Sequence, residues 1–308
     1  MSSFNAIAIE SDFPVLQNQQ DIGVSPCNLI WRQRKLLVKL FPQFKQPYMP
    51  SLDNQQRLVE CLQRSPIQLI RLDHNLSEAQ IRLWADASHQ ANKSVYLELP
   101  AAESIARKRR SFNWIVKRCS DWLAAIVLLL LLMPLMVFLS LLVYFSSPGP
   151  IFFQQWRVGE RGKLFRIYKF RTMVVDAEKL HHQLMANQNG LHKLADDPRL
   201  TRLGAWMRKY SLDELPQLFN VLRGEMSLVG PRPWALYDAM RLNGEGKKRL
   251  NALPGITGAW QVQARSTLLD INAVNNLDLD YLHNWSLARD LAILLQTFPK
   301  VLSGFGAF

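Results

Sequence analysis

Apolar and polar positions follow different patterns along the chain, and these patterns divide it into three parts. In the first part, Ile67–Leu72 and Val95–Leu99 are short apolar runs of the length typical of buried strands. Between them, a helical periodicity ends at Ala91 and begins at Ser77, a residue type favoured at helix starts. Residues 1–50 show no clear period. The pattern predicts a small α/β module. Because no glycine-rich phosphate loop accompanies it, we expect a regulatory or structural role.

The second part is one long apolar run, Trp122–Phe145, with 24 residues and no charged side chain. A run above about 18 apolar residues predicts a membrane helix, and this one lies too far along the chain for a cleavable signal peptide. Pro134 lies in its middle, where proline kinks a helix. Basic residues flank both ends, whereas a spanning helix carries its Lys/Arg excess on one side. These features favour a re-entrant helix, but spanning helices also tolerate proline, so both topologies stay open.

The third part predicts a helical domain with a short β-hairpin. Ile151–Phe153 and Leu164–Phe170 have strand patterns on either side of a turn with two glycines. Helical patterns follow over Asp176–Asn187, Thr201–Lys209, Glu214–Leu222 and Leu287–Leu302. The predicted fold class is α+β, with four segments: an N-terminal α/β module (1–105), a basic juxtamembrane segment (106–121), a re-entrant membrane helix (122–145), and a compact, mostly helical domain with a β-hairpin and interfacial helices (146–308).

The net charge of +12 is unevenly distributed over the 308 residues. Residues 1–105 carry ten basic and ten acidic side chains, and six basic residues then follow from Arg107 to Arg118 without an acidic one. Such an excess fits a membrane surface, a phosphorylated substrate or nucleic acid. Aromatic residues gather at the apolar run rather than along a basic stripe, which argues against nucleic acid. Three cysteines without metal-site spacing argue against a disulfide framework, and a mean hydropathy of -0.06 excludes a polytopic transporter.

The candidate chemistry centres on Asp213 and Glu214. A structural interpretation is available, because Ser211 and Glu214 have the spacing of a capping box and Asp213 would complement a helix dipole. However, arginines bind phosphate well, and adjacent carboxylates among cations suit Mg²⁺ shared with phosphate. A carboxylate in such a place can also act as a nucleophile. The cations of this segment are Arg199, Arg202, Arg208, Lys209, Arg223 and Arg232.

Three motifs, in order along the chain, resemble those of one enzyme family. They are FFQQWRVGERGKLFRIYKFRTM (152–173), DPRLTRLGAWMRKYSLDELPQLFNVLRGEMSLVGPRP (197–233) and PGITGAWQVQAR (254–265). The sequence resembles the bacterial sugar transferases, the monotopic phosphoglycosyl transferases that begin lipid-linked glycan assembly. The resemblance covers residues 112–308, and residues 1–105 have no counterpart in it.

This resemblance implies transfer of a sugar-1-phosphate from a UDP-sugar to a polyprenyl phosphate, usually undecaprenyl phosphate, with release of UMP. That reaction is the first membrane step of exopolysaccharide, capsule, O-antigen or glycoconjugate assembly. Asp213 matches the family's nucleophile, which forms a covalent aspartyl-phosphosugar intermediate. Glu214 matches the second acidic residue, and the pair is assigned to catalysis and to Mg²⁺. Pro134 matches the family's helix-breaking proline, and the residues assigned to phosphate or nucleotide binding are Lys169, Arg171, Arg208 and Arg232.

The resemblance also places the protein at the bacterial inner (plasma) membrane, with its catalytic domain on the cytoplasmic face and in contact with membrane lipid. The sugar, the glycan pathway, the role of residues 1–105 and the oligomeric state, a homodimer included, stay open. The alternative function is a non-catalytic membrane-anchored scaffold or sensor. It explains the apolar run and the basic stretches, but not the acidic pair among arginines.

Overall fold

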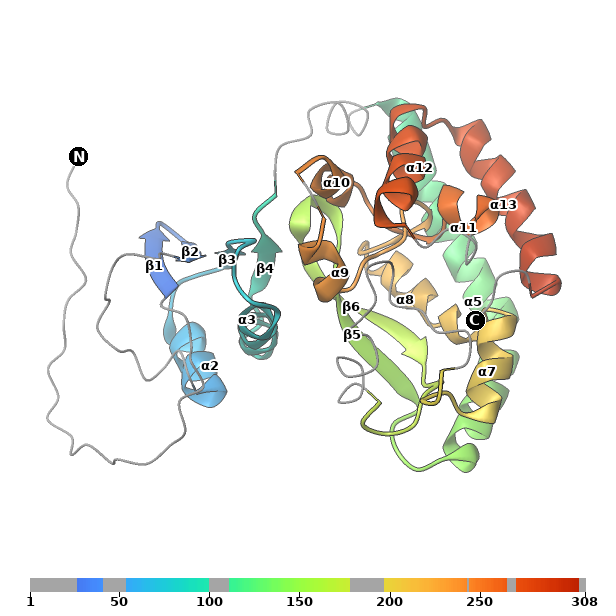
Figure 1. Ribbon diagram of the computed structural model, residues 1–308, viewed down its shortest axis with the longest axis horizontal. Coiled ribbons are helices and arrows are strands. Elements are labelled where there is room, and N and C mark those ends of the chain that lie inside the picture. The colour runs from blue at the N-terminus through green and yellow to red at the C-terminus, as the bar shows by residue number, and fades with distance from the viewer. Residues whose placement is uncertain are drawn as a thin grey trace, which may run out of the picture.

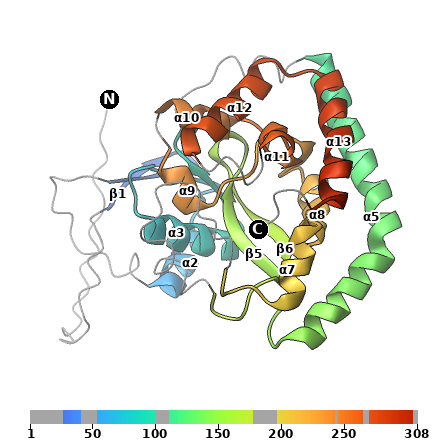
Figure 2. The ribbon, with the colours of Figure 1, turned by 45° about the vertical axis from the view of Figure 1, so that its right-hand side comes forward.

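The computed structural model describes residues 27–40, 54–99, 111–177, 197–242, 244–264 and 270–304. Figure 1 shows a smaller N-terminal module on the left and a larger, mainly helical body on the right. The large body carries a β-hairpin on the side that faces the module, and one long helix runs along its outer side (Figures 1 and 2). The mixed α and β character predicted from the sequence is confirmed.

The N-terminal module is built on a four-stranded sheet in the order β1-β2-β3-β4. The predicted strand–helix–strand unit is present as β3 (Leu69–Leu72), α3 (Glu78–Gln90) and β4 (Ser94–Leu97), with β3 and β4 parallel. Ser77 caps α3 as expected, in a reciprocal capping box with Gln80. The elements absent from the prediction are β1 (Cys27–Arg32), β2 (Lys35–Leu40) and α2 (Gln55–Arg64).

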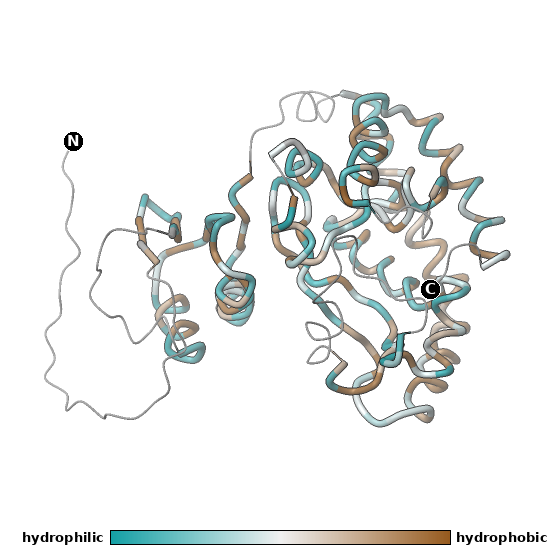
Figure 3. The backbone as a smooth tube through the Cα atoms, in the orientation of Figure 1, coloured by the Kyte–Doolittle hydropathy of each residue, from teal (hydrophilic) through white to brown (hydrophobic). Residues whose placement is uncertain are grey.

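The apolar run belongs to α5 (Phe112–Ser146), a helix of 35 residues that begins ten residues before the predicted segment. It continues through Pro134 without interruption. Only 17% of its most apolar 18-residue window is buried, and Figure 3 shows hydrophobic positions along much of its length. By length and composition α5 is a candidate membrane helix.

Both ends of α5 pack against the same body of the protein. Near its start, Ala125 is fully buried among residues of α8 and α11, and the Trp122 indole N–H donates to the Val221 carbonyl at 3.2 Å. Near its end, Leu139 and Val143 are buried against Phe170 and Met207. The exposed apolar face of α5 therefore lies between two anchored ends.

The predicted hairpin is confirmed, with β5 (Phe152–Val158) antiparallel to β6 (Leu164–Phe170) around the short 3-10 helix η1 (Glu160–Gly162). The predicted helix Thr201–Lys209 is present as α7 (Arg202–Lys209), and the predicted helix Leu287–Leu302 is α13 (Leu287–Leu302). The helix predicted over Asp176–Asn187 lies mostly outside the described residues. The remaining elements are η2 (Leu212–Glu214), α8 (Gln217–Leu222), β7 (Ser227–Val229), α9 (Leu236–Met240), α10 (Gly244–Lys248), η3 (Arg249–Asn251), β8 (Gly255–Thr257), α11 (Ala259–Gln263) and α12 (Ile271–His283).

The expectation that the basic residues before the apolar run face a membrane is wrong for Lys117. Its side chain is buried, and its ammonium group donates to Asp290 Oδ2 at 2.6 Å and to the Val229 carbonyl at 3.0 Å. Arg118 is also engaged within the protein, because its guanidinium donates to the Met226 carbonyl at 3.0 Å and lies 3.3 Å from Asp121 Oδ2 on the same helix. These charges hold the start of α5 against the body, because a buried cation must be paired with an anion. Arg107–Arg110 lie outside the described residues.

Candidate active site

The acidic pair lies in a tight turn rather than at the start of a long helix. Asp213 and Glu214 belong to η2, and the helix α8 begins only after Pro216, because proline fits the first turn of a helix but not its interior. Ser211 adopts a left-handed conformation with φ of 55°, and its hydroxyl makes no capping hydrogen bond. The capping-box interpretation is therefore wrong for Ser211 and Glu214.

Lys169 on β6 joins the two carboxylates. Its ammonium nitrogen lies 2.5 Å from Glu214 Oε1 and 3.7 Å from Asp213 Oδ2. The Asp213 side chain is 8% exposed, whereas the Glu214 side chain is 16% exposed. Lys169 and Glu214 are 45 residues apart in sequence, so the fold brings this cation to the acidic pair.

Two arginines complete the positive surroundings. The Arg232 guanidinium lies 3.5 Å from Glu214 Oε1, and about a third of the Arg232 side chain is exposed. The guanidinium also lies over the Trp260 ring, 5.9 Å from the ring centre. Arg208 on α7 donates through Nε to the Thr172 hydroxyl at 2.9 Å. Its charge also acts on Asp213. The predicted residues Lys169, Arg208 and Arg232 thus surround the acidic pair.

Burial and charge act on Asp213 in opposite directions. Burial raises the pKa of the Asp213 carboxyl above its ordinary value, the neighbouring Glu214 raises it further, and the cations of Lys169, Arg208 and Arg232 lower it. Burial lowers the pKa of the Lys169 ammonium group, while both carboxylates counteract this effect. The ionised form of Asp213, which a nucleophile requires, therefore depends on these cations.

Arg171 lies in a different setting from the other predicted phosphate-binding residues. Its side chain is buried and donates to the carbonyl oxygens of Ser147 and Pro148, each at 2.6 Å, and to the Ser147 hydroxyl at 3.0 Å. These carbonyls follow the last turn of α5, where helix geometry leaves acceptors without partners. Arg171 therefore fixes the end of α5, and its binding of a substrate phosphate stays a prediction.

The structure also identifies residues behind the site that sequence reasoning missed. Arg249 is 1% exposed, pairs with the buried Asp278, and donates to the Arg232 carbonyl at 2.9 Å. Arg157 donates to the Pro233 carbonyl at 3.1 Å. Together they hold the loop that carries Arg232. Arg157 lies inside the first motif, but nothing in the sequence around Arg249 marks it as buried.

The site offers two carboxylates to a metal ion. Among the described residues, no group of three or more His, Cys, Asp or Glu side chains could hold a metal on its own. Mg²⁺ is commonly bound by one or two carboxylates together with substrate phosphates, and adjacent acidic residues among phosphate-binding cations fit that mode. The two carboxylates are therefore compatible with Mg²⁺ whose remaining ligands come from the phosphate groups of a substrate.

Comparisons with known proteins identify relatives of the region that carries this site. The family model described as bacterial sugar transferase matches residues 112–304. The chain is 44% identical over 196 residues to the galactosyl transferase CpsE of Streptococcus agalactiae, covering 63% of this chain and 43% of that protein. It is 42% identical over 200 residues to the undecaprenyl-phosphate galactose phosphotransferase of Salmonella typhimurium, covering 63% and 42%. It is 38% identical over 206 residues to the exopolysaccharide production protein ExoY of Sinorhizobium fredii, covering 65% and 91%.

The matched region starts at the first residue of α5 and contains every residue of the acidic site. The chain spans less than half the length of the first two relatives but nearly all of the third. The N-terminal module lies outside the family match. From α5 to the end of α13, the chain belongs to the bacterial sugar transferase family.

Proposed function

We propose that the protein transfers a sugar-1-phosphate from a UDP-sugar to polyprenyl phosphate, releasing UMP and forming a polyprenyl-diphosphate-sugar. The observation that carries this proposal is the buried Asp213 beside Glu214, with Lys169, Arg208 and Arg232 around them. This arrangement offers one nucleophilic carboxylate and several cations for phosphate groups. The name of one relative, the undecaprenyl-phosphate galactose phosphotransferase of Salmonella typhimurium, supports the same reaction class.

The proposed reaction proceeds in two displacements at one phosphorus atom. A carboxylate oxygen of Asp213 forms a bond to the β-phosphorus of the UDP-sugar while the bond to the bridging oxygen breaks, so that UMP leaves with the electron pair. A phosphate oxygen of the lipid then attacks the same phosphorus, and the bond to Asp213 breaks. The Asp213 carboxylate is regenerated, and the product is the lipid diphosphate sugar.

The cations have separate tasks in this scheme. Lys169 orients both carboxylates and lowers the pKa of Asp213, which keeps the nucleophile ionised. Arg208 and Arg232 bind the phosphate groups of the donor and stabilise the charge that develops on them. Mg²⁺, held by Asp213 and Glu214 together with the donor, would supply further neutralisation of the diphosphate.

The proposed membrane placement is monotopic, on the cytoplasmic face of the bacterial inner membrane. Both ends of α5 pack against one body, which would lie on a single side of a bilayer. A straight helix of 35 residues would reach about 52 Å, longer than the roughly 30 Å hydrocarbon core. In the proposed placement α5 bends at Pro134 without breaking, so that its exposed apolar face enters the bilayer while both ends stay on one side. The exposed aromatic residues Tyr144 and Phe145 suit the membrane interface.

The test is UMP release by purified protein with polyprenyl phosphate and a panel of UDP-sugars. The panel includes UDP-galactose, because the names of two relatives contain that sugar or its transfer, together with UDP-glucose and UDP-N-acetylgalactosamine. At least one donor should give lipid-dependent UMP release, and Asp213→Asn should abolish it. Asp280→Asn is the matched control, because Asp280 is an exposed aspartate on α12. No turnover with any donor would favour the non-catalytic scaffold, and wild-type turnover by Asp213→Asn would refute the role of Asp213.

A further inference from the structure

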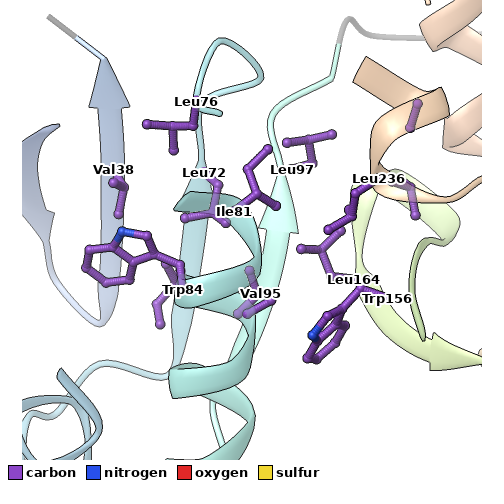
Figure 4. Close-up of a cluster of buried hydrophobic side chains, with 14 of the residues drawn as sticks. Val38, Leu72, Leu76, Ile81, Trp84, Val95, Leu97, Trp156, Leu164 and Leu236 are labelled. Carbon is purple, nitrogen blue, oxygen red and sulfur yellow. The ribbon is translucent and has the colours of Figure 1, made fainter. Parts of the chain in front are cut away.

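The N-terminal module, which lies outside the family match, shares one hydrophobic core with the hairpin of the catalytic domain. Val95 and Leu97 of β4 belong to the same buried cluster as Trp156 and Leu164 of the hairpin (Figure 4). Leu236 of α9 extends the cluster on the catalytic side. A shared core excludes water from the junction and makes separation of the two parts costly, because apolar surface would be exposed.

Backbone contacts fix how the module meets the hairpin. Tyr96 of β4 and Lys163 form an isolated antiparallel bridge. At the neighbouring Gly162, with φ of +78°, an added Cβ atom would clash with the Leu97 carbonyl oxygen. Only glycine permits this approach. The end of β4 is therefore seated directly on the turn of the hairpin.

Asp86 on α3 makes the polar contact at this junction. Its Oδ1 atom accepts hydrogen bonds from Trp156 Nε1 at 2.8 Å and from Arg166 Nη2 at 2.7 Å. Trp156 and Arg166 face each other across the two strands of the hairpin, and the Arg166 guanidinium lies 5.0 Å from the Trp156 ring centre. The Asp86 carboxylate therefore binds both β5 and β6 at one pair of directly opposite residues.

A rigid stretch of β6 leads from this contact to the active site. Lys169, which joins Asp213 and Glu214, follows Arg166 by three residues. Between them, the fully buried Asn220 of α8 donates to the Arg166 carbonyl at 2.8 Å and accepts from the Tyr168 amide at 3.0 Å. Asn220 therefore fixes the backbone of β6 against α8 between Arg166 and Lys169, so the contact with Asp86 and the active-site lysine lie on one hydrogen-bonded stretch of the strand.

We propose that the N-terminal module is a built-in positioning element of the catalytic site, and that Asp86 is the positioning residue through which its docking fixes Lys169 beside the acidic pair. This inference goes beyond the proposed reaction, since it gives a role to the part of the chain outside the family match. It makes the activity of the catalytic domain dependent on a module that could transmit an external signal. Asp86 itself does not contact the reacting groups.

The experiment combines hydrogen exchange and kinetics on the full-length chain carrying Asp86→Ala. Amide exchange should rise in peptides that cover 152–170 and stay unchanged in α12 and α13. The kcat for UMP release should fall by about tenfold with a smaller change in KM, because small misplacements of catalytic groups have effects of up to about 100-fold. The variant Asp86→Asn, which keeps an acceptor oxygen for Trp156, should give a smaller fall.

A double-mutant cycle tests the route through Arg166. If Asp86 acts through this residue, the double variant Asp86→Ala/Arg166→Ala should have the kcat of the more affected single variant rather than the product of both effects. Glu60→Ala is the matched control, because it removes an exposed carboxylate of α2 in the same module, and it should leave exchange and kcat unchanged.

Three results would overturn the proposal: unchanged exchange over 152–170 in Asp86→Ala, a uniform rise over the whole chain, or fully multiplicative effects in the cycle. The exchange measurement needs no substrate. If the wild-type protein released no UMP, the proposed reaction would fail, while the exchange pattern would still decide whether Asp86 holds the hairpin.

Discussion

At the residue scale, the acidic pair could be predicted from the sequence, whereas the contacts made by the surrounding cations could be predicted only in part. Two adjacent carboxylates in an arginine-rich segment indicate phosphate chemistry from residue types alone. Spacing along the chain does not show where a guanidinium points. Arg171 lies two residues after Lys169, yet its side chain binds the end of α5 while that of Lys169 joins the acidic pair. Lys117 is a second example, because a cluster of basic residues in the sequence gives no sign that one of them is buried.

Replacing Lys169 should change the pH dependence of the reaction. Burial raises the pKa of Asp213 and the Lys169 cation lowers it, so Lys169→Met removes a lowering charge. The Asp213 pKa then rises, and the acidic limb of the profile of kcat/KM against pH moves to higher pH. Lys209→Met, which removes an exposed lysine of α7, should leave the limb in place. A limb that stays fixed or moves to lower pH in Lys169→Met would contradict the electrostatic role of Lys169.

At the scale of elements, the sequence predicted those whose local signals are strong. The capping box of Ser77 and Gln80 marks the start of α3, and the pattern over Leu287–Leu302 coincides with α13. The β1–β2 hairpin was not predicted because its two-residue turn, Gln33–Arg34, contains no glycine, asparagine or aspartate, the residues expected in such turns. Gln33 nevertheless adopts a left-handed conformation, with φ of 55°. The start of α5 was not predicted because Lys117 and Asp121 interrupt its apolar pattern, and their contacts with Asp290, Ser227 and Leu228 form only in the folded protein.

The end of α5 gives a prediction for Arg171. Arg171→Ala should lower the free energy of unfolding by about 1–3 kcal/mol, because it removes the charge-assisted hydrogen bonds from the buried Arg171 side chain to the carbonyls of Ser147 and Pro148. It should leave KM for the UDP-sugar unchanged. Thermal unfolding in detergent and steady-state kinetics measure the two effects, with the exposed Arg202→Ala as control. A raised KM with unchanged stability would instead return Arg171 to the substrate site.

At the scale of the whole molecule, the positive charge serves more than one purpose. The N-terminal 105 residues contribute none of the net charge. Part of the excess after them surrounds the acidic pair, and part is neutralised inside the protein, as Lys117 is by Asp290. Composition could indicate anionic partners, but only the fold separates the charges available to a partner from those used internally.

The monotopic placement predicts that both sides of α5 share one face of the membrane. Single cysteines at positions 5 and 300, introduced into a chain without its native Cys27, Cys61 and Cys119, should both react with a membrane-impermeant reagent only when the cytoplasmic face is accessible. Reaction from opposite faces would show that α5 spans the bilayer. The proposed reaction site would then need a different relation to the membrane.

The central claim is that Asp213 carries the sugar phosphate as a covalent intermediate. It is tested most directly by the mass of the protein after incubation with an accepted UDP-sugar in the absence of lipid phosphate. The account predicts a mass increase equal to one sugar phosphate, located on the peptide that contains Asp213, lost in Asp213→Asn and removed by adding polyprenyl phosphate. Lipid-dependent UMP release without any such adduct, or an adduct on a peptide that does not contain Asp213, would contradict it.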